Sequence, residues 1–523
     1  MSVLTDGLNP QQLAAVKHSG SPLLVVAGAG SGKTRVLTRR VAYLLAERNV
    51  APYEVLAITF TNKAAGEMKE RVTHLVGDRA KMMWVSTFHS ACVRILRREA
   101  ALLGYTNSFT IYDQSDSLRL VTLVMRDLNL DAKRYAPRAV AALISQAKNE
   151  LLGPADYLNQ SKDHFQEIVA QVFAIYQKRL SAANSMDFDD LIAKSVEVMQ
   201  RFPECRAKYR SRFKHILVDE YQDTNHAQYV LIKELVGSEQ EGFPPAELCV
   251  VGDADQSIYA FRGANIRNIL QFEADYLNAK TILLEQNYRS TQNILNAANS
   301  VIANNEGRKE KNLWSEAGAG ELITGYVAES EHDEADFVVQ QIRKLQESGK
   351  SNPGDTAIFY RTNAQSRVFE EVFMRVAIPY KVVGGVRFYE RKEIKDFLAY
   401  LRVIVNPNDE VSMRRIINTP KRGIGDRALD QLDLYAQANN ISFWQGLCEV
   451  EKNSEIAPRS AGSLVEFVKL IQSLQTLVEA KTRPSVIAQA TLEQSGLLAE
   501  LSQSNDPQDE VRIENLEELV AVA

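Results

Sequence analysis

Short apolar runs alternate with amphipathic runs along the first 110 residues of the chain. The uniformly apolar run Leu23–Ala27 predicts a buried strand, and Thr34–Arg48 then repeats its apolar residues at helical spacing. Val55–Phe60 and Met83–Phe88 predict two further strands, and a helical pattern follows each of them. Because strands that alternate with helices pair in parallel, this pattern predicts a parallel sheet with helices on both faces.

The pattern changes between about residues 115 and 190, where the chain is rich in Ala, Leu and charged residues and carries no strand signal. Strands resume at His215–Val218, Leu248–Val251 and Thr281–Leu284. We therefore predict an all-helical insertion within one doubly wound lobe.

A second α/β region begins near residue 290, with strands predicted at Ile323–Val327 and Thr356–Tyr360. From about residue 386 the pattern is again helical. The first lobe is predicted in two parts, at residues 1–110 and 190–287, with a helical insertion at residues 111–189 between them. The second lobe is predicted at residues 288–385, and a second helical domain at residues 386–523.

The length and composition agree with this division. A chain of 523 residues is too long for a single hydrophobic core, so two to four domains are expected. Its 45% hydrophobic and 24% charged residues are typical of a globular protein. No apolar run approaches the roughly 18 residues of a membrane span, and the N-terminal sequence lacks the pattern of an export signal. A cytoplasmic location is expected.

The four cysteines are Cys92, Cys205, Cys249 and Cys448, and no two of them have CxxC spacing. This separation favours reduced and mostly buried thiols over a metal site or a disulfide framework.

The charge is unevenly distributed. The net charge is −5, yet residues 1–100 carry fourteen Lys and Arg against seven Asp and Glu. Residues 501–523 reverse this balance, with six acidic residues and Arg512 as the one basic residue. Because a local field acts over about 10 Å at ordinary salt, a basic face can bind phosphates on an acidic protein. The composition therefore permits a nucleic-acid partner.

A glycine-rich loop lies between the first predicted strand and the helix that follows it. Its residues are Ala27, Gly28, Ala29, Gly30, Ser31, Gly32, Lys33 and Thr34, and Arg35 follows in the same turn. Small residues let backbone N–H groups wrap a triphosphate at a helix N-terminus. Lys33 would then reach the β- and γ-phosphates, and the Thr34 hydroxyl would ligate Mg²⁺. The alternative is a plain turn with a chance lysine, but its position between a strand and a helix favours nucleotide binding.

An acidic pair follows the strand predicted at His215–Val218. Asp219 would hold Mg²⁺, and Glu220 would orient or deprotonate the attacking water. Acidic residues can also simply end a strand. Together with the glycine-rich loop, however, the pair predicts a P-loop ATPase.

Further segments narrow the kind of ATPase. They are Leu8–Gln12, Thr59–Ala65, Ser86–Ser90, Gly252–Tyr259, Gln286–Ser290, Tyr360–Arg367, Gly384–Gly385 with Phe388–Arg391, and Gly423–Gly425. In this order and spacing the chain resembles the superfamily 1 helicases of the UvrD, Rep and PcrA group, and most of all its PcrA members. The resemblance implies RecA-like motor lobes with helical inserted domains.

The resemblance also assigns the nucleotide contacts. It implies that Gln12 reads the adenine edge and that the Tyr288 ring stacks on the base, roles that an amide and an aromatic ring can perform. It implies that Arg289 stabilises charge on the γ-phosphoryl group. Gln256 would contact the same phosphate, and the loss of this contact would be transmitted to the DNA-facing Tyr259 and Phe261.

The same resemblance implies a set of DNA contacts, namely Phe60, Thr61, Asn62, His89, Tyr259, Phe261, Arg262, Arg361 and Asn363. The aromatic residues among them could stack on bases without regard to sequence. Taken singly, each aromatic residue is about as often part of a core. Phe261 departs from the tryptophan common in the family, so weaker stacking is expected there. The turn Gly423–Gly425 is either a phosphate clasp on duplex DNA or a plain turn between helices.

Two late motifs of the family are not recognised in the last part of the chain. We therefore expect an incomplete second lobe and weak ATP hydrolysis. The overall interpretation is an ATP- and Mg²⁺-dependent 3′–5′ DNA helicase of repair or replication, which binds single-stranded DNA and duplex junctions and no membrane. The alternatives are a non-motor module that binds ATP and DNA, and the helicase part of a helicase–nuclease.

Overall fold

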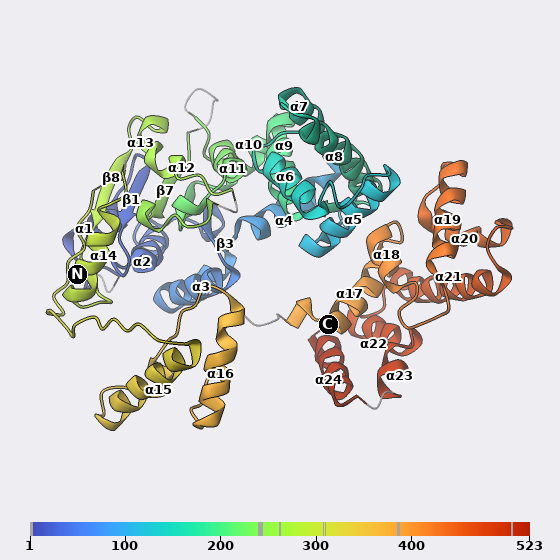
Figure 1. Cartoon of the computed structure of the whole chain (residues 1–523). Helices are drawn as coiled ribbons and strands as arrows, with labels where there is room; N and C mark the ends of the chain where they lie inside the picture. Colours follow the sequence, from blue (N-terminus) through green and yellow to red (C-terminus); the bar gives the residue numbers. More distant parts are fainter. Residues whose placement is uncertain are drawn as a thin grey trace. The chain divides into compact units, whose positions relative to one another are not determined.

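The computed structural model describes residues 4–238, 244–260, 263–306, 308, 310–383, 388–503 and 506–522 (Figure 1). Its internal contacts divide the chain into two compact units. One unit comprises Met1–Gly320 with Asp396–Ala523, and the other comprises Glu321–Lys395. The four-domain division expected from the sequence stays a prediction. In the structure, residues 288–320 pack with the first unit.

The first unit contains a six-stranded sheet. Its strands are β1 (Leu23–Ala27), β2 (Val55–Thr59), β3 (Trp84–Thr87), β6 (His215–Val218), β7 (Glu247–Gly252) and β8 (Lys280–Leu284). Their order in space is β3-β2-β6-β7-β1-β8, and every neighbouring pair is parallel. All six strands were predicted, each end to within one residue, so the expected doubly wound α/β fold is confirmed.

Helices cover both faces of this sheet. They include α1 (Pro10–Lys17), α2 (Lys33–Ala46), α3 (Asn62–Val76), α4 (Phe88–Glu99), α9 (Phe188–Arg201), α10 (Pro203–Arg212) and α11 (His226–Val236). Alternate residues of a strand point to opposite faces. Accordingly, Leu23 and Val25 pack with α2 and α3 in one core, while Leu24 and Val26 pack with α4, α9 and α11 in the other.

The parallel register brings the carboxyl ends of the strands to one edge of the sheet. Val26 pairs with Gly252, Ala27 with Leu284, and Ile58 with Val218. The loops that follow these strands therefore meet along the same edge. Ligands of open α/β sheets bind outside the carboxyl ends of the strands, so this edge positions the candidate site.

The helical insertion lies between two short strands, β4 (Thr110–Tyr112) and β5 (Ser185–Asp187), which pair in parallel. Its helices are α5 (Gln114–Asp127), α6 (Pro137–Asn149), α7 (Pro154–Gln160) and α8 (His164–Ala182), which share a core of their own. The strand β5 corrects the expectation of an all-helical segment. Three residues are too few to produce a period of two in the sequence.

The remaining helices of the first unit lie on both sides of the second unit in sequence. They are α12 (Arg267–Leu270), α13 (Phe272–Asp275), α14 (Gln292–Ile302), α18 (Glu410–Ile416), α19 (Asp426–Asn439), α20 (Phe443–Cys448), α21 (Pro458–Glu479), α22 (Pro484–Gln494), α23 (Leu497–Ser502) and α24 (Pro507–Val522), with α17 (Lys392–Val405) spanning the boundary. The helical pattern expected from about residue 386 is confirmed.

The second unit contains α15 (Glu331–Glu347) and α16 (Ser366–Arg375), which pack on a small apolar core. The strands predicted at Ile323–Val327 and Thr356–Tyr360 are not formed. Neither segment has a hydrogen-bonded neighbouring strand among the residues described. A strand needs such a neighbour, and here apolar side chains such as Val327 and Phe359, each 95% exposed, lack a packing surface.

The four cysteines are unpaired; Cys92, Cys205 and Cys249 are buried and Cys448 is exposed. Within the described part of the chain, no helix is both long and apolar enough to cross a membrane.

Candidate nucleotide site and DNA-facing loops

The glycine-rich loop joins β1 to α2 at the carboxyl edge of the sheet. Gly30 and Gly32 have φ angles of 65° and 86°, which lie in the left-handed region that favours glycine. A Cβ atom at Gly30 would lie 2.6 Å from the Asn287 amide nitrogen and 2.8 Å from the Arg289 Cβ. This position therefore requires glycine because two residues after β8 pack directly against it.

Hydrogen bonds from several directions fix the loop. The Gly28 N–H donates to the Leu284 carbonyl at 3.1 Å, and the Ser31 hydroxyl donates to the Gly28 carbonyl at 2.7 Å. The Asn287 amide donates to the Ala29 carbonyl at 2.6 Å. The loop is thus held in a preformed shape, which is what phosphate binding by backbone N–H groups requires.

Gln12 lies behind the loop instead of at an open edge. It is fully buried, its amide nitrogen donates to the Ser31 carbonyl at 2.9 Å, and its amide oxygen accepts from the Asn9 N–H at 3.2 Å. The Asn9 amide in turn donates to the Tyr288 hydroxyl at 3.0 Å. Tyr288 is half-exposed, so its ring is available to a base. Gln12 therefore supports the loop in this structure, and its predicted contact with adenine stays a prediction.

Three of the predicted catalytic side chains meet at the start of α2. The Lys33 ammonium lies 3.1 Å from a Glu220 carboxylate oxygen and 3.5 Å from the Gln256 amide oxygen. The Gln222 amide donates to the same Glu220 oxygen at 2.9 Å. Glu220 itself has a φ of 49°, a left-handed conformation that is strained for a residue with a side chain and is typical of functional sites.

Asp219 and Thr34 are the oxygen donors predicted for Mg²⁺. Asp219 is buried at the end of β6, where burial and then the charge of Glu220 raise the pKa of its carboxyl to about 6, while Lys33 lowers it. A divalent cation would offset this desolvated charge, and carboxylate and hydroxyl oxygens suit Mg²⁺. Within the described residues, no group of three or more His, Cys, Asp and Glu side chains could hold a metal ion. These donors fit an ion that also takes phosphate oxygens and water.

Sequence reasoning missed a cationic pair beside this site. The ammonium of the buried Lys311 contacts both Asp253 and Asp255, and the Arg308 guanidinium contacts Asp255 at 3.0 and 3.1 Å. Asp253 also accepts a 2.6 Å hydrogen bond from the Gln256 amide. Lys311 and Gln256 therefore share the Asp253 carboxylate as a hydrogen-bond partner. No local spacing in the sequence indicates this pair, because Lys311 lies 58 residues from Asp253.

The remaining nucleotide residues lie close to the loop. The Tyr288 N–H donates to the Gly30 carbonyl at 2.9 Å, and the Arg289 N–H donates to the Asn287 side chain at 2.8 Å. A Cβ atom at Gly7 would lie 2.9 Å from the Arg35 guanidinium. Arg35 is therefore placed against the N-terminal segment, and Arg289 begins its side chain beside the phosphate loop.

The predicted DNA residues of the first unit lie on neighbouring strand-end loops. The ring centroids of Phe60 and Tyr259 are 5.1 Å apart, which brings the loops after β2 and β7 together. The Asn62 side chain accepts from Thr87 at 3.4 Å and thereby joins the loop after β2 to the loop after β3. Thr61 and Asn62 are exposed.

His89 occupies the first turn of α4. It makes an edge-to-face contact with Phe188, with ring centroids 5.7 Å apart. Burial lowers its pKa and thereby favours the neutral ring. It therefore offers an aromatic face and a hydrogen bond instead of a positive charge.

The other predicted DNA residues are placed differently. Arg361 and Asn363 are exposed residues of the second unit. Phe261, Arg262 and the pair Gly384–Gly385 lie outside the described residues.

The turn Gly423–Gly425 precedes α19. Gly423 has a φ of 73°, and Ile424 is buried. The preceding Arg422 donates to the Tyr400 hydroxyl at 2.6 Å and to the Ser495 carbonyl at 2.8 Å. These bonds hold the turn inside the helical region, which favours the interpretation as a connection between helices.

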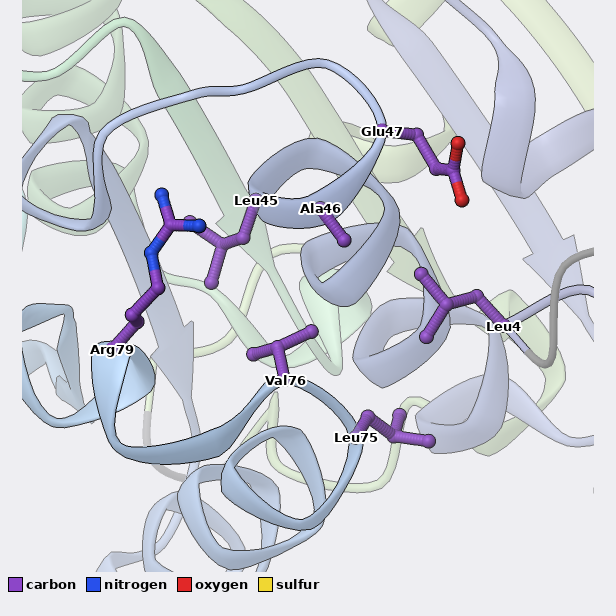
Figure 2. Close-up of a pocket in the computed structure, with 7 residues that line it drawn as sticks. All are labelled: Leu4, Leu45, Ala46, Glu47, Leu75, Val76 and Arg79. Atoms are coloured by element: carbon purple, nitrogen blue, oxygen red, sulfur yellow. The ribbon is translucent and has the colours of Figure 1, made fainter.

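A separate pocket of about 310 Å³ lies between the C-terminal ends of α2 and α3 (Figure 2). It is lined by Leu4, Leu45, Ala46, Glu47, Leu75, Val76 and Arg79. Because α2 spans 14 residues, this pocket lies about 20 Å along the helix from Lys33. It has no part in the candidate site.

A P-loop and an acidic strand end at one edge of a parallel sheet define a P-loop protein with RecA-like architecture. The chain matches the family models of the UvrD/REP helicase N-terminal domain over residues 8–277 and of the UvrD-like helicase C-terminal domain over residues 282–523. It belongs to the UvrD/REP helicase family.

Curated relatives agree with this assignment. ATP-dependent DNA helicase UvrD1 of Mycobacterium tuberculosis is 58% identical over 527 residues, which cover 99% of this chain and 68% of the relative. UvrD1 of Mycobacterium leprae is 55% identical over 531 residues, with the same shares. ATP-dependent DNA helicase PcrA of Staphylococcus aureus is 50% identical over 525 residues, 100% of this chain and 70% of the relative.

These comparisons correct two expectations. The UvrD1 proteins are more similar to the chain than this PcrA is, so a greatest likeness to PcrA is not supported. The expected absence of the late motifs is not supported either, because the C-terminal family model matches through residue 523. Two short motifs are a weaker criterion of family membership than similarity over a whole domain. The expectation of weak hydrolysis rested on that absence, and the comparisons do not show it.

Proposed function

We propose that this protein is an ATP-dependent DNA helicase that moves 3′ to 5′ along single-stranded DNA and separates duplexes in DNA repair or replication. One observation carries the proposal. Gln256 and Tyr259 lie three residues apart after β7; Gln256 lies 3.5 Å from Lys33, and Tyr259 packs on Phe60. A single short segment thus contacts both the candidate nucleotide site and the candidate DNA platform.

The nucleotide half of the proposal assigns a task to each side chain. Lys33 neutralises the β- and γ-phosphates, Arg289 stabilises charge that develops on the transferred group, and Glu220 orients or deprotonates the attacking water. Mg²⁺, which screens phosphate charge, would be held by Thr34 and Asp219. The half-exposed Tyr288 ring would stack on the base.

The DNA half rests on the paired rings and the neighbouring polar residues. Stacking on aromatic rings tolerates any base sequence, as a protein that moves along DNA requires. When Gln256 loses a phosphate partner, its loop can shift, and Tyr259 then moves against Phe60. This shared loop is the proposed link between hydrolysis and movement along the strand.

The test is strand separation on duplexes that carry a 3′ tail, a 5′ tail or no tail, each with ATP and Mg²⁺. We expect unwinding of the 3′-tailed duplex alone, and none by Lys33→Ala. Equal unwinding of the 5′-tailed duplex would contradict the direction. ATP and DNA binding without any unwinding or hydrolysis would instead identify a non-motor binding module.

A further inference from the structure

Three arginines surround one buried tryptophan at the edge of the sheet. The guanidinium carbons of Arg94, Arg212 and Arg98 lie 4.0, 5.1 and 6.0 Å from the centroid of the Trp84 ring. Trp84 begins β3, Arg94 and Arg98 lie one turn apart on α4, and Arg212 ends α10. We call these four residues the Trp84 arginine cluster.

The cluster contains hydrogen-bond donors and lacks acceptors. Trp84 is only 1% exposed, and its indole nitrogen has no hydrogen-bond partner in the part of the chain that the structure describes. The same is true of the buried Arg212 Nε. None of the three arginines forms an ion pair with a carboxylate among the described residues. Buried donors without acceptors cost free energy, so each calls for an explanation.

The charges within the cluster are also unbalanced. Burial and then the charges of Arg98 and Arg212 lower the pKa of Arg94, and no carboxylate opposes them. Glu99 follows Arg98 directly but is engaged with the Lys208 ammonium at 2.6 Å and the Tyr209 hydroxyl at 3.0 Å. Stacking on Trp84 offsets part of the repulsion, because the face of an indole ring attracts cations. An anion would offset the remainder.

We propose that the Trp84 arginine cluster binds backbone phosphates of single-stranded DNA beyond the strand-end loops. Guanidinium groups present flat forks of N–H donors that match phosphate oxygens, and stacking on a ring leaves the edges of the forks free. The proposal rests on the proposed function, because it extends the same DNA path.

The position of the cluster favours DNA over an acidic protein segment. Trp84 lies three residues before Thr87, so it is about 10 Å along β3 from the end of the strand, where α4 begins and carries His89. The helix α4 carries His89 in its first turn and Arg94 and Arg98 further along the same helix. A DNA strand that contacts the protein near His89 can therefore continue along α4 to the Trp84 arginine cluster. The cluster also accounts for part of the positive excess in residues 1–100.

The structural alternative is that the arginine stems only shield Trp84 from water, which requires no ligand. Salt dependence separates the two interpretations, because each phosphate contact releases counterions. For single strands, each contact contributes about 0.7 to the slope of log affinity against log salt.

The experiment measures binding of labelled oligo(dT) to the whole chain across a salt series. It compares Arg94→Gln and Arg98→Gln with Lys233→Ala, which removes an exposed positive charge from α11. We expect each arginine variant to lower the slope by about 0.7 on a long oligonucleotide and to leave it unchanged on one that spans the loops alone. Lys233→Ala should match the unaltered protein. Melting temperatures should stay similar, since Arg94 and Arg98 are exposed.

Unchanged slopes for both arginine variants, with oligo(dT) bound normally, would overturn the cluster proposal and leave the proposed function standing. Absence of oligo(dT) binding by the unaltered protein would overturn both. A third outcome is that polyglutamate binds the unaltered protein but not the arginine variants, while the salt slopes for DNA stay unchanged. This result would overturn the cluster proposal in favour of an acidic protein partner.

Discussion

The Lys33 ammonium lies 3.1 Å from a carboxylate oxygen of Glu220. The two residues are 187 positions apart in sequence, and the parallel sheet brings the loop after β1 and the end of β6 together. Lys33 is well buried, and Glu220 retains more exposure to solvent. A triphosphate in the P-loop would compete with Glu220 for the ammonium. Binding and the release of the catalytic carboxylate are therefore linked.

The contact between Phe60 and Tyr259 predicts a role in DNA binding. Phe60→Leu should weaken binding of single-stranded DNA by about 1–3 kcal/mol, similarly for different base compositions, because leucine keeps the apolar volume and removes the π face. Fluorescence titration with homopolymers measures the effect.

Phe60→Trp is the matched control, because it keeps an aromatic face and should bind almost normally. A large fall in melting temperature for Phe60→Leu, with normal affinity of the remaining folded protein, would instead identify Phe60 as part of the core.

Lys311 is predicted to position Gln256 through Asp253. Lys311→Met should lower the kcat of DNA-stimulated ATP hydrolysis roughly a hundredfold, the scale of losing one preorganised polar group, and change the KM for ATP little. The expected reason is that an unbalanced Asp253 holds Gln256 away from the phosphate.

Steady-state ATPase assays give the two constants. Lys344→Met, which removes the charge of an exposed lysine of α15, serves as the control. A raised KM with an unchanged kcat for Lys311→Met would contradict the positioning role and indicate a contribution to ground-state binding.

Glu247 is predicted to make the stability of the fold depend on pH. Burial alone would raise the pKa of this carboxyl, but two hydrogen bonds of 2.7 Å from Arg48, and the His215 ring nitrogen 3.4 Å away, hold it well below its usual range. A carboxyl whose pKa is lowered by folding contributes stability above its unfolded pKa of about 4.5, and this contribution is lost as the pH falls below that value.

Glu247→Gln should therefore lower the melting temperature at pH 7, with a loss of about 1–3 kcal/mol for hydrogen bonds to a charged group. The difference from the unaltered protein should narrow below about pH 4.5. Thermal melts at a series of pH values measure it. A difference in melting temperature that stayed constant down to acid pH would show that Glu247→Gln destabilises the fold through altered packing and not through the lost charge.

The inner strands of the first unit could be predicted because short, largely apolar runs are buried on both faces of a parallel sheet. Leu23–Ala27 is such a run, and every residue in it is buried. The short β5 could not be predicted, because its three residues carry no period. The segment Ile323–Val327 has a strand-like pattern, but a pattern does not supply the hydrogen-bonded neighbour that a strand needs.

The residues of the candidate site likewise fall into those that local sequence patterns predict and those that only the folded structure reveals. Gly30, Lys33 and Asp219 follow from local patterns, because a phosphate loop and an acidic strand end are short contiguous motifs. Lys311 could not be found from spacing, since it lies 58 residues from its partner Asp253. The side-chain direction of Gln12 depends on bonds to Asn9 and Ser31, which only the folded chain provides.

The most direct test of the account is the rate of ATP hydrolysis with and without single-stranded DNA, for the unaltered chain and for Lys33→Ala. The account predicts that DNA stimulates hydrolysis by the unaltered chain. It also predicts that Lys33→Ala lowers the stimulated rate at least about a hundredfold while still binding DNA, because the phosphate contacts and the DNA loops involve different side chains. A stimulated rate that survives in Lys33→Ala would contradict the assignment of the P-loop. A rate indifferent to DNA would contradict the proposed coupling.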